Sequence, residues 1–255
     1  MSLTWYTYNF VDSATITATN EDSDFPVTNL QDHRRTKVFR STTASSVITF
    51  DLKSRESVDS IVITENPKFG FGFTGNITVE ANATNEWSSP AFTATIDASD
   101  DINKTHGFAY KEFSAQEYRF WRLSFSGSSY VEVSNIFIGS KWSMTDNDIG
   151  LQWSYQDSDI VDVTENAIGQ RFFTDRGKQK TIRGSINYMN ATELDQFLQL
   201  YDHNRILKPF YIRWCDGIVN DVDRFSGFYF MANKPEIINS APALYNVSIE
   251  LVEAK

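Results

Sequence analysis

Apolar and polar residues alternate along much of the chain, which is the pattern of half-buried β-strands. Several runs place three alternating apolar side chains on one face: Ile48, Phe50 and Leu52; Ile77, Val79 and Ala81; Trp121, Leu123 and Phe125. Shorter runs follow at 131–133 and 136–138, and clusters of Ser, Asn, Gly and Asp separate them. This pattern predicts an antiparallel β-sandwich or barrel for the first part of the chain.

The second part contains a change of period. Strands are expected at 180–188, 208–214, 227–230 and 245–251, with Ile182, Gly184, Ile186 and Tyr188 on one face of the first. Between the first two strands, apolar residues follow the spacing of one helical stripe: Leu194, Phe197, Leu198 and Tyr201. This spacing predicts one short helix at about 191–203. Asn190 or Thr192 can cap its start, and Glu193 lies in its first turn.

The change of pattern predicts two domains, 1–142 and 143–255. The segment 143–148 is polar and acidic and lies between Gly139 and Gly150, which marks it as a linker. The expected fold is mainly β. An N-terminal jelly-roll sandwich would be followed by an antiparallel sandwich or barrel with one helix.

Charge excludes some functions. The 255 residues carry 23 Lys and Arg against 33 Asp and Glu, a net charge of −10. Residues 1–145 and 146–255 each carry −5, so neither part is a basic module for binding nucleic acid. No apolar stretch reaches the length of a membrane span and no signal peptide is expected. The single Cys cannot form an internal disulfide, which fits folding in a reducing cytoplasm.

Two groups of motifs in the first part resemble a known family. The first runs from Phe25-Pro-Val-Thr-Asn-Leu-Gln-Asp32 through Thr36-Lys-Val-Phe-Arg-Ser41 to the strands at 47–52 and 58–63. The second is Tyr118-Arg-Phe-Trp-Arg-Leu-Ser-Phe125 with the strands up to Gly139. Together they resemble the galactose-binding-like, discoidin-type (F5/8 type C) jelly roll over roughly residues 13–140. Phe39 departs from the family, where Trp is commoner, and the middle third has no matching motif.

The resemblance implies candidate sites in the loops. Asn29 and Asp32 are expected to fix a loop through side chain to backbone hydrogen bonds. Asp32 is also a weak Ca²⁺ candidate because some members of the family bind Ca²⁺ in this loop; no cofactor and no other metal are expected.

Two loops offer ligand or interface candidates: Phe69, Phe71 and Phe73 in the Gly-rich loop 66–75, and Trp87. The three Phe side chains either form an exposed apolar patch, or fold back into the core, or belong to a paired strand. Trp87 is either a platform for stacking a sugar or a buried loop anchor. Arg122 is expected to pair or stack within the fold.

The order of elements in residues 150–255 is similar to the tail-tube-like sandwich of long-tailed phages. This resemblance rests on strand order and on the segment 176–186, the helix and the C-terminal strand. It implies a distal tail or minor tail protein. Such a subunit would form a ring with copies of itself, with a hexamer favoured over a trimer. Its other partners would be tube and hub proteins and, through the jelly roll, a host surface glycan. It would be located in the virion tail after assembly in the host cytoplasm.

The loop 170–180 supplies the candidates for ring contacts. They are two aromatic and three basic residues: Arg171, Phe172, Phe173, Arg176 and Lys178. Either this loop docks on a neighbouring subunit, or it is a solvated hairpin whose Phe side chains are buried. The sequence favours neither alternative over the other.

Catalytic patterns are poorly represented, and the protein is expected not to be an enzyme. The three His residues lack metal-binding spacing, and neither a nucleophile elbow nor a P-loop occurs. Acidic pairs such as Asp157 with Asp159 fall in expected loops and keep a glycoside hydrolase open as a weak alternative. A free bacterial carbohydrate-binding protein is the stronger alternative.

Overall fold

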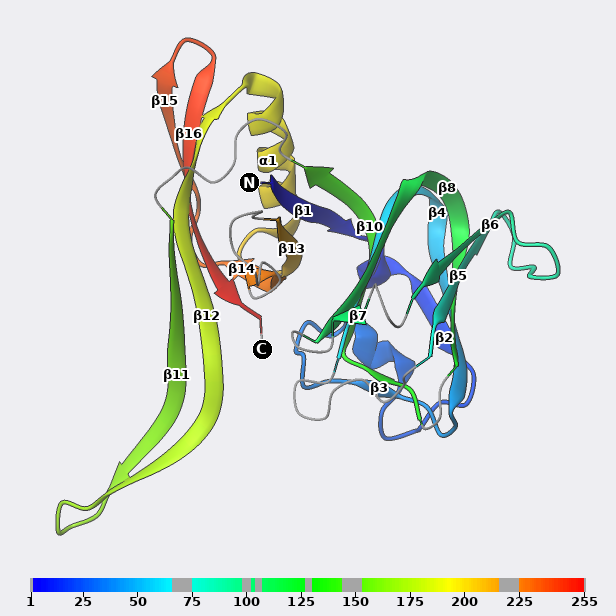
Figure 1. Cartoon of the computed structure of the whole chain (residues 1–255), viewed down its shortest axis with the longest axis horizontal. Coiled ribbons are helices and arrows are strands. Elements are labelled where there is room, and N and C mark those ends of the chain that lie inside the picture. Colours follow the sequence, from blue (N-terminus) through cyan, green and yellow to red (C-terminus); the bar gives the residue numbers. More distant parts are fainter. Residues whose placement is uncertain are drawn as a thin grey trace. The chain divides into compact units, whose positions relative to one another are not determined.

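The computed structural model describes residues 2–65, 75–97, 102–103, 107–126, 130–143, 153–215 and 225–254. It divides into two compact units. The jelly-roll unit contains Thr4–Ser143 and Phe210–Gly227. The arm unit contains Met1–Leu3, Met144–Pro209 and Phe228–Lys255. The segment Phe210–Gly227, which the sequence boundary assigned to the second domain, therefore lies in the jelly-roll unit. The fold is mainly β, as predicted (Figure 1).

The strands of the jelly-roll unit are β1 (Ser2–Asn9), β2 (Thr15–Ala18), β3 (Phe39–Arg40), β4 (Ser45–Thr64), β5 (Ile77–Asn82), β6 (Phe92–Ile96), β7 (Ile102–Asn103), β8 (Phe108–Ser126), β9 (Glu132–Val133), β10 (Asn135–Ser143) and β13 (Phe210–Cys215). Their order is β13-β1-β10-β4-β8-β5-β6, with β2 beside β4 and β7 beside β8. A separate pair joins β3 to β9. Two short 3₁₀ helices, Phe10–Ser13 and Val27–Gln31, complete this unit.

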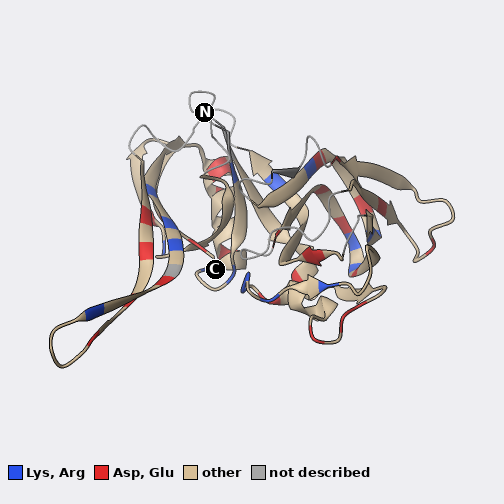
Figure 2. Cartoon of the chain, turned by 60° about the horizontal axis from the view of Figure 1, so that its bottom comes forward, with Lys and Arg blue, Asp and Glu red and all other residues tan. Residues whose placement is uncertain are grey.

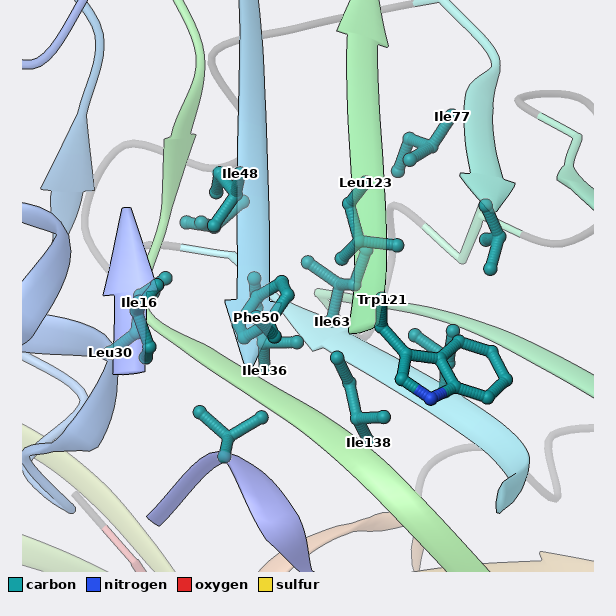
Figure 3. Close-up of a cluster of buried hydrophobic side chains, with 14 of the residues drawn as sticks. Ile16, Leu30, Ile48, Phe50, Ile63, Ile77, Trp121, Leu123, Ile136 and Ile138 are labelled. Atoms are coloured by element: carbon teal, nitrogen blue, oxygen red, sulfur yellow. The ribbon is translucent and has the colours of Figure 1, made fainter. Parts of the chain in front are cut away.

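Two long strands connect the layers of the sandwich. The first part of β4 pairs with β2 and with the last part of β8, whereas its second part pairs with β10 and with the first part of β8. The β4–β8 register shifts after Asp51 and after Val58, where the strands bend. The predicted faces of Phe50 and Trp121 are buried in the core between the layers, together with Ile136 and Ile138 (Figure 3).

The arm unit is built from β11 (Ser154–Glu165), β12 (Arg171–Met189), β14 (Gly227–Met231), β15 (Glu236–Ala241), β16 (Leu244–Glu253) and the helix α1 (Ala191–Asn204). The order is β11-β12-β16-β14, and β15 pairs with β16. The helix packs on β12 and β16. No helix in the described ranges has the length and apolar character needed to cross a bilayer.

The predicted helix is confirmed with small differences. Asn190 caps it: its side chain accepts from the Glu193 amide while the Glu193 carboxylate accepts from the Asn190 amide, which is a capping box. Phe197 is buried as predicted, but the second fully buried apolar side chain is Leu200, which the predicted stripe omitted.

The predicted inward position of Tyr188 is wrong, because this residue is 60% exposed. It has a φ of 61°, in the left-handed region. The β12–β16 register shifts between Ile186 and Met189, so Met189 takes the buried position instead. A bulge of this kind cannot be read from alternation alone.

Candidate functional site

The most unusual surface of the molecule is the β11–β12 hairpin of the arm unit. Strand β16 pairs with β12 only between Thr181 and Met189. Among the described residues, the preceding part of β12 pairs with β11 alone. Figure 1 shows this part of the hairpin extending beyond the other strands of its unit. We call residues 161–175 the distal arm. Both of its strands are solvated on both faces.

The end of the distal arm is a defined turn. The Asn166 side-chain oxygen accepts hydrogen bonds from the amides of Ile168 and Gln170, at 3.2 and 2.9 Å. Gly169 has a φ of 80°, a conformation that glycine adopts at little cost. Beside the turn, Arg171 Nε donates to Glu165 Oε2 at 2.9 Å. The end is therefore held in one conformation by polar contacts and not by an apolar core.

Apolar side chains of the distal arm lie in water. Val163 and Phe173 face each other across the strands and are 54% and 68% exposed. Phe172 lies on the other face and is 53% exposed. The alternative that the two Phe side chains are buried in the hairpin is therefore wrong. An isolated two-stranded ribbon is marginal in water, and exposed aromatic residues on it normally mark a contact surface.

The remaining candidates of this segment lie in β12 and not in a loop. Lys178 is exposed and stands opposite Asp159 in the register. Arg176 lies in the strand, but its side chain is outside the described part. The expected loop position of Asp157 and Asp159 is wrong, because both residues belong to β11. Where the hairpin joins the rest of the unit, a hydrogen bond connects β12 to β16: the Lys180 amide donates to Glu253 Oε2 at 3.2 Å.

The arm unit carries a second open surface, where α1 ends. A hollow of about 440 Å³ is lined by Tyr201, Asp202, Arg205, Ile206, Leu207 and Lys234. We call it the helix-end hollow. Ile206 and Leu207 are 52% and 69% exposed. Arg205 has a φ of 51°, a conformation in which glycine is the usual residue. Sequence analysis missed this surface, because the helical stripe ends at Tyr201.

The jelly-roll unit carries a polar hollow of about 460 Å³, lined by Asp22, Arg40, Ser41, Thr42 and Tyr130. Arg40 is held by Glu132, which is fully buried: Arg40 Nε donates to Glu132 Oε2 at 2.5 Å. The guanidinium lies 4.1 Å from the centre of the Phe25 ring and 5.3 Å from that of Tyr130. Hydroxyl, carboxylate and guanidinium groups beside an aromatic ring are suited to a ligand rich in hydroxyl groups. The sequence did not indicate this hollow as a site, because three separate segments contribute its residues.

The other loop candidates have structural contacts or lie outside the described residues. Phe69, Phe71 and Phe73 belong to the latter group. Trp87 is half-buried, donates from Nε1 to Asn85 Oδ1, and has the Arg122 guanidinium 4.5 Å from its ring centre. Arg122 also pairs with Glu80, so its predicted structural role is confirmed.

The predicted loop contacts of Asn29 and Asp32 are confirmed. Asn29 donates to the Val38 carbonyl at 2.8 Å, and Asp32 accepts from the Arg34 amide at 3.0 Å. The Arg34 guanidinium also binds both Asp32 oxygens and lowers the pKa of Asp32 to about 2. Within the described ranges, no three His, Cys, Asp or Glu side chains are grouped so that they could hold a metal ion.

A polar cluster fixes β13 to the jelly-roll unit. Glu112 accepts from the Tyr6 hydroxyl at 2.7 Å and from Lys141 Nζ at 2.6 Å, and Arg213 lies 3.5 Å away. Arg213 also donates to the Tyr110 hydroxyl at 2.6 Å. Burial alone would raise the pKa of Glu112, but the hydrogen bonds from Lys141 and Tyr6 outweigh it and lower the pKa. Because every group of the cluster is engaged by another, its role is structural.

No protein-family profile and no curated protein matches the chain. Solved structures do match. A fucose binding module of Streptococcus pneumoniae, SpX-3, is 13% identical, and the match covers 52% of this chain and 98% of the module, with a TM-score of 0.44. The family 32 carbohydrate-binding module of NanJ from Clostridium perfringens, in complex with galactose, is 15% identical, covering 55% of this chain and 99% of the module, with a TM-score of 0.43. The lectin binding domain of Lectinolysin, complexed with Lewis b, is 12% identical. This match covers 53% of this chain and 99% of the domain, with a TM-score of 0.44. At these TM-scores, the description of the architecture rests on the strand order given above.

Proposed function

We propose that this protein is a non-enzymatic structural subunit of the tail or tail tip of a long-tailed phage. The arm unit would form a ring with copies of itself, and the jelly-roll unit would contact other tail proteins or a host glycan. The observation that carries the proposal is the distal arm, a structured hairpin whose aromatic side chains are exposed in the single chain. Covering such a side chain with another surface removes it from water and lowers the free energy of the system.

The size of this gain supports an assembly role. A Phe side chain buries about 200 Å². The exposed fractions of Phe172 and Phe173, 53% and 68%, therefore leave roughly 240 Å² to be covered. Covering this area is worth about 6 kcal/mol before the costs of association are subtracted. One arm therefore supports only a weak contact. A closed ring repeats the contact at every subunit, so weak contacts suffice there.

The net charge of −10 supports the same proposal. A ring around a DNA channel must not bind the passing phosphates, and an acidic protein repels them. Both units share the acidic character, and Figure 2 shows acidic residues along the strands of each.

Gene neighbourhood tests the proposal most directly. The tail assignment predicts flanking genes for tape-measure, tube and hub proteins, and predicts that the protein is found in purified virions. Neighbours that encode sugar metabolism, together with absence from any virion, would refute it. A monomer in solution would not refute it, because a tail subunit can stay monomeric until it meets the partner protein on which the ring forms.

The polar hollow of the jelly-roll unit favours a second candidate, a free carbohydrate-binding protein. Tyr130 is 42% exposed and places an aromatic ring, on which a sugar could stack, in the lining of this hollow. Calorimetry with galactose and fucose tests this candidate, with Tyr130→Ala as the variant and Trp87→Ala as a control at another aromatic residue. A strict monomer that binds sugar through Tyr130 would favour the second candidate. Equal binding by wild type and the Tyr130 variant would exclude the hollow as the site.

A further inference from the structure

The arm unit offers two different surfaces that suit each other. The distal arm presents Val163, Phe172 and Phe173, and the helix-end hollow presents Ile206 and Leu207. Figure 1 shows the arm pointing away from α1 within this unit. Two unlike surfaces on one subunit produce head-to-tail contacts, which close into a ring when the rotation permits. We propose that the distal arm of one copy docks in the helix-end hollow of the next copy. This inference rests on the proposed function and names the acceptor surface.

Charge supports the pairing. Residues 161–175 contain three acidic residues and one basic residue, which gives a formal charge of −2. The basic residue, Arg171, is already paired with Glu165. The hollow carries Arg205 and Lys234 against Asp202, a formal charge of +1. Docking would thus bring an acidic apolar hairpin to a basic apolar hollow, which favours this contact over a contact between two arms.

Arg205 supplies an independent argument. Its backbone conformation, with a φ of 51° and a ψ of −141°, suits glycine and strains a residue with a side chain. A glycine here would stabilise the helix end. The exposed arginine is therefore unfavourable for the fold of the single chain. It is explained if the guanidinium binds a partner, and the acidic distal arm carries suitable groups.

Because glycine suits the backbone conformation at position 205, the substitution Arg205→Gly can separate a structural role of the arginine from a role in binding. Arg205→Gly should leave the melting temperature unchanged or raise it, while it weakens self-association at least 5-fold. A purely structural Arg205 would give the opposite result, a lower melting temperature with unchanged association. Sedimentation velocity over a concentration series up to about 1 mM, where even weak contacts form, measures the association. Ile237→Ser with Ile238→Ser is the matched control, because these side chains are 41% and 49% exposed on β15 but lie outside both surfaces.

Mixing two variants tests the pairing itself. The arm variant Phe172→Ser/Phe173→Ser and the hollow variant Arg205→Glu/Leu207→Ser should each be monomeric alone. An equimolar mixture should form a dimer and nothing larger, because it contains one intact arm and one intact hollow. A monomeric mixture, or a hollow variant that still self-associates, would overturn the inference. A wild-type chain that stays monomeric at about 1 mM would overturn it as well. The phage-tail proposal would survive all three results, because virion content and gene neighbourhood test it separately.

Discussion

Replacing Glu132 by Gln should strongly destabilise the jelly-roll unit. Glu132 is fully buried and forms an ion pair with Arg40, whose side chain is 27% exposed. The two residues stand opposite each other in the β3–β9 pair. The variant removes the negative charge and leaves the Arg40 guanidinium between Phe25 and Tyr130 without its counter-charge.

The expected loss follows from burial. Breaking a buried ion pair by removing one partner costs about 3–5 kcal/mol, and partial solvation of Arg40 places this pair near 3 kcal/mol. For a protein of this size, 1 kcal/mol corresponds to a shift in melting temperature of about 2–4 °C. We therefore expect a decrease of roughly 10 °C.

Thermal unfolding followed by circular dichroism at pH 7 measures this decrease, and a double-mutant cycle with Arg40→Met isolates the pair. The double variant should be more stable than either single variant, because it leaves no uncompensated charge. A loss below about 1 kcal/mol for Glu132→Gln, or additive losses in the cycle, would show that the pair behaves as a solvated surface pair and would refute the reasoning.

Two further predictions concern the polar cluster and the helix. The pKa of Glu112 is lowered below its usual 4.5, so this carboxylate stabilises the fold above pH 4.5 and loses the effect as the pH falls through the lowered pKa. Glu112→Gln should therefore lower the melting temperature at pH 7 and have less effect at pH 3; equal effects at both pH values would contradict this role. Asn190→Ala should cost about 1 kcal/mol in urea unfolding, because it breaks the capping box, and Asn190→Ser should restore most of the loss. An unchanged midpoint for Asn190→Ala would show that tertiary packing alone fixes the helix start.

Local patterns were sufficient to predict the helix and many of the strands. Strands with one wet and one buried face alternate in the sequence, so the faces of Phe50 and Trp121 were correctly placed. The start of α1 was equally clear, because the Asn190 cap is a contact between neighbours in the chain. Strand β1 was missed because Trp5 and Tyr6 are both buried and leave no alternation. Strand β11 was missed for the opposite reason, since solvent lies on both of its faces.

Tertiary structure decided the features on which function depends. The sequence alone could not tell whether Phe172 and Phe173 are buried, because exposure depends on which strands cover β12, and β16 pairs with β12 only from Thr181 onward. Nor could it bring Arg40 to Glu132, or Arg213 to Glu112, across 92 and 101 positions in the chain. Backbone pairing and burial create these contacts only when the strands assemble. The sequence therefore determined the helix and the strands that have one buried face, whereas assembly of the sheets determined the exposed arm, the hollows and the unit to which β13 belongs.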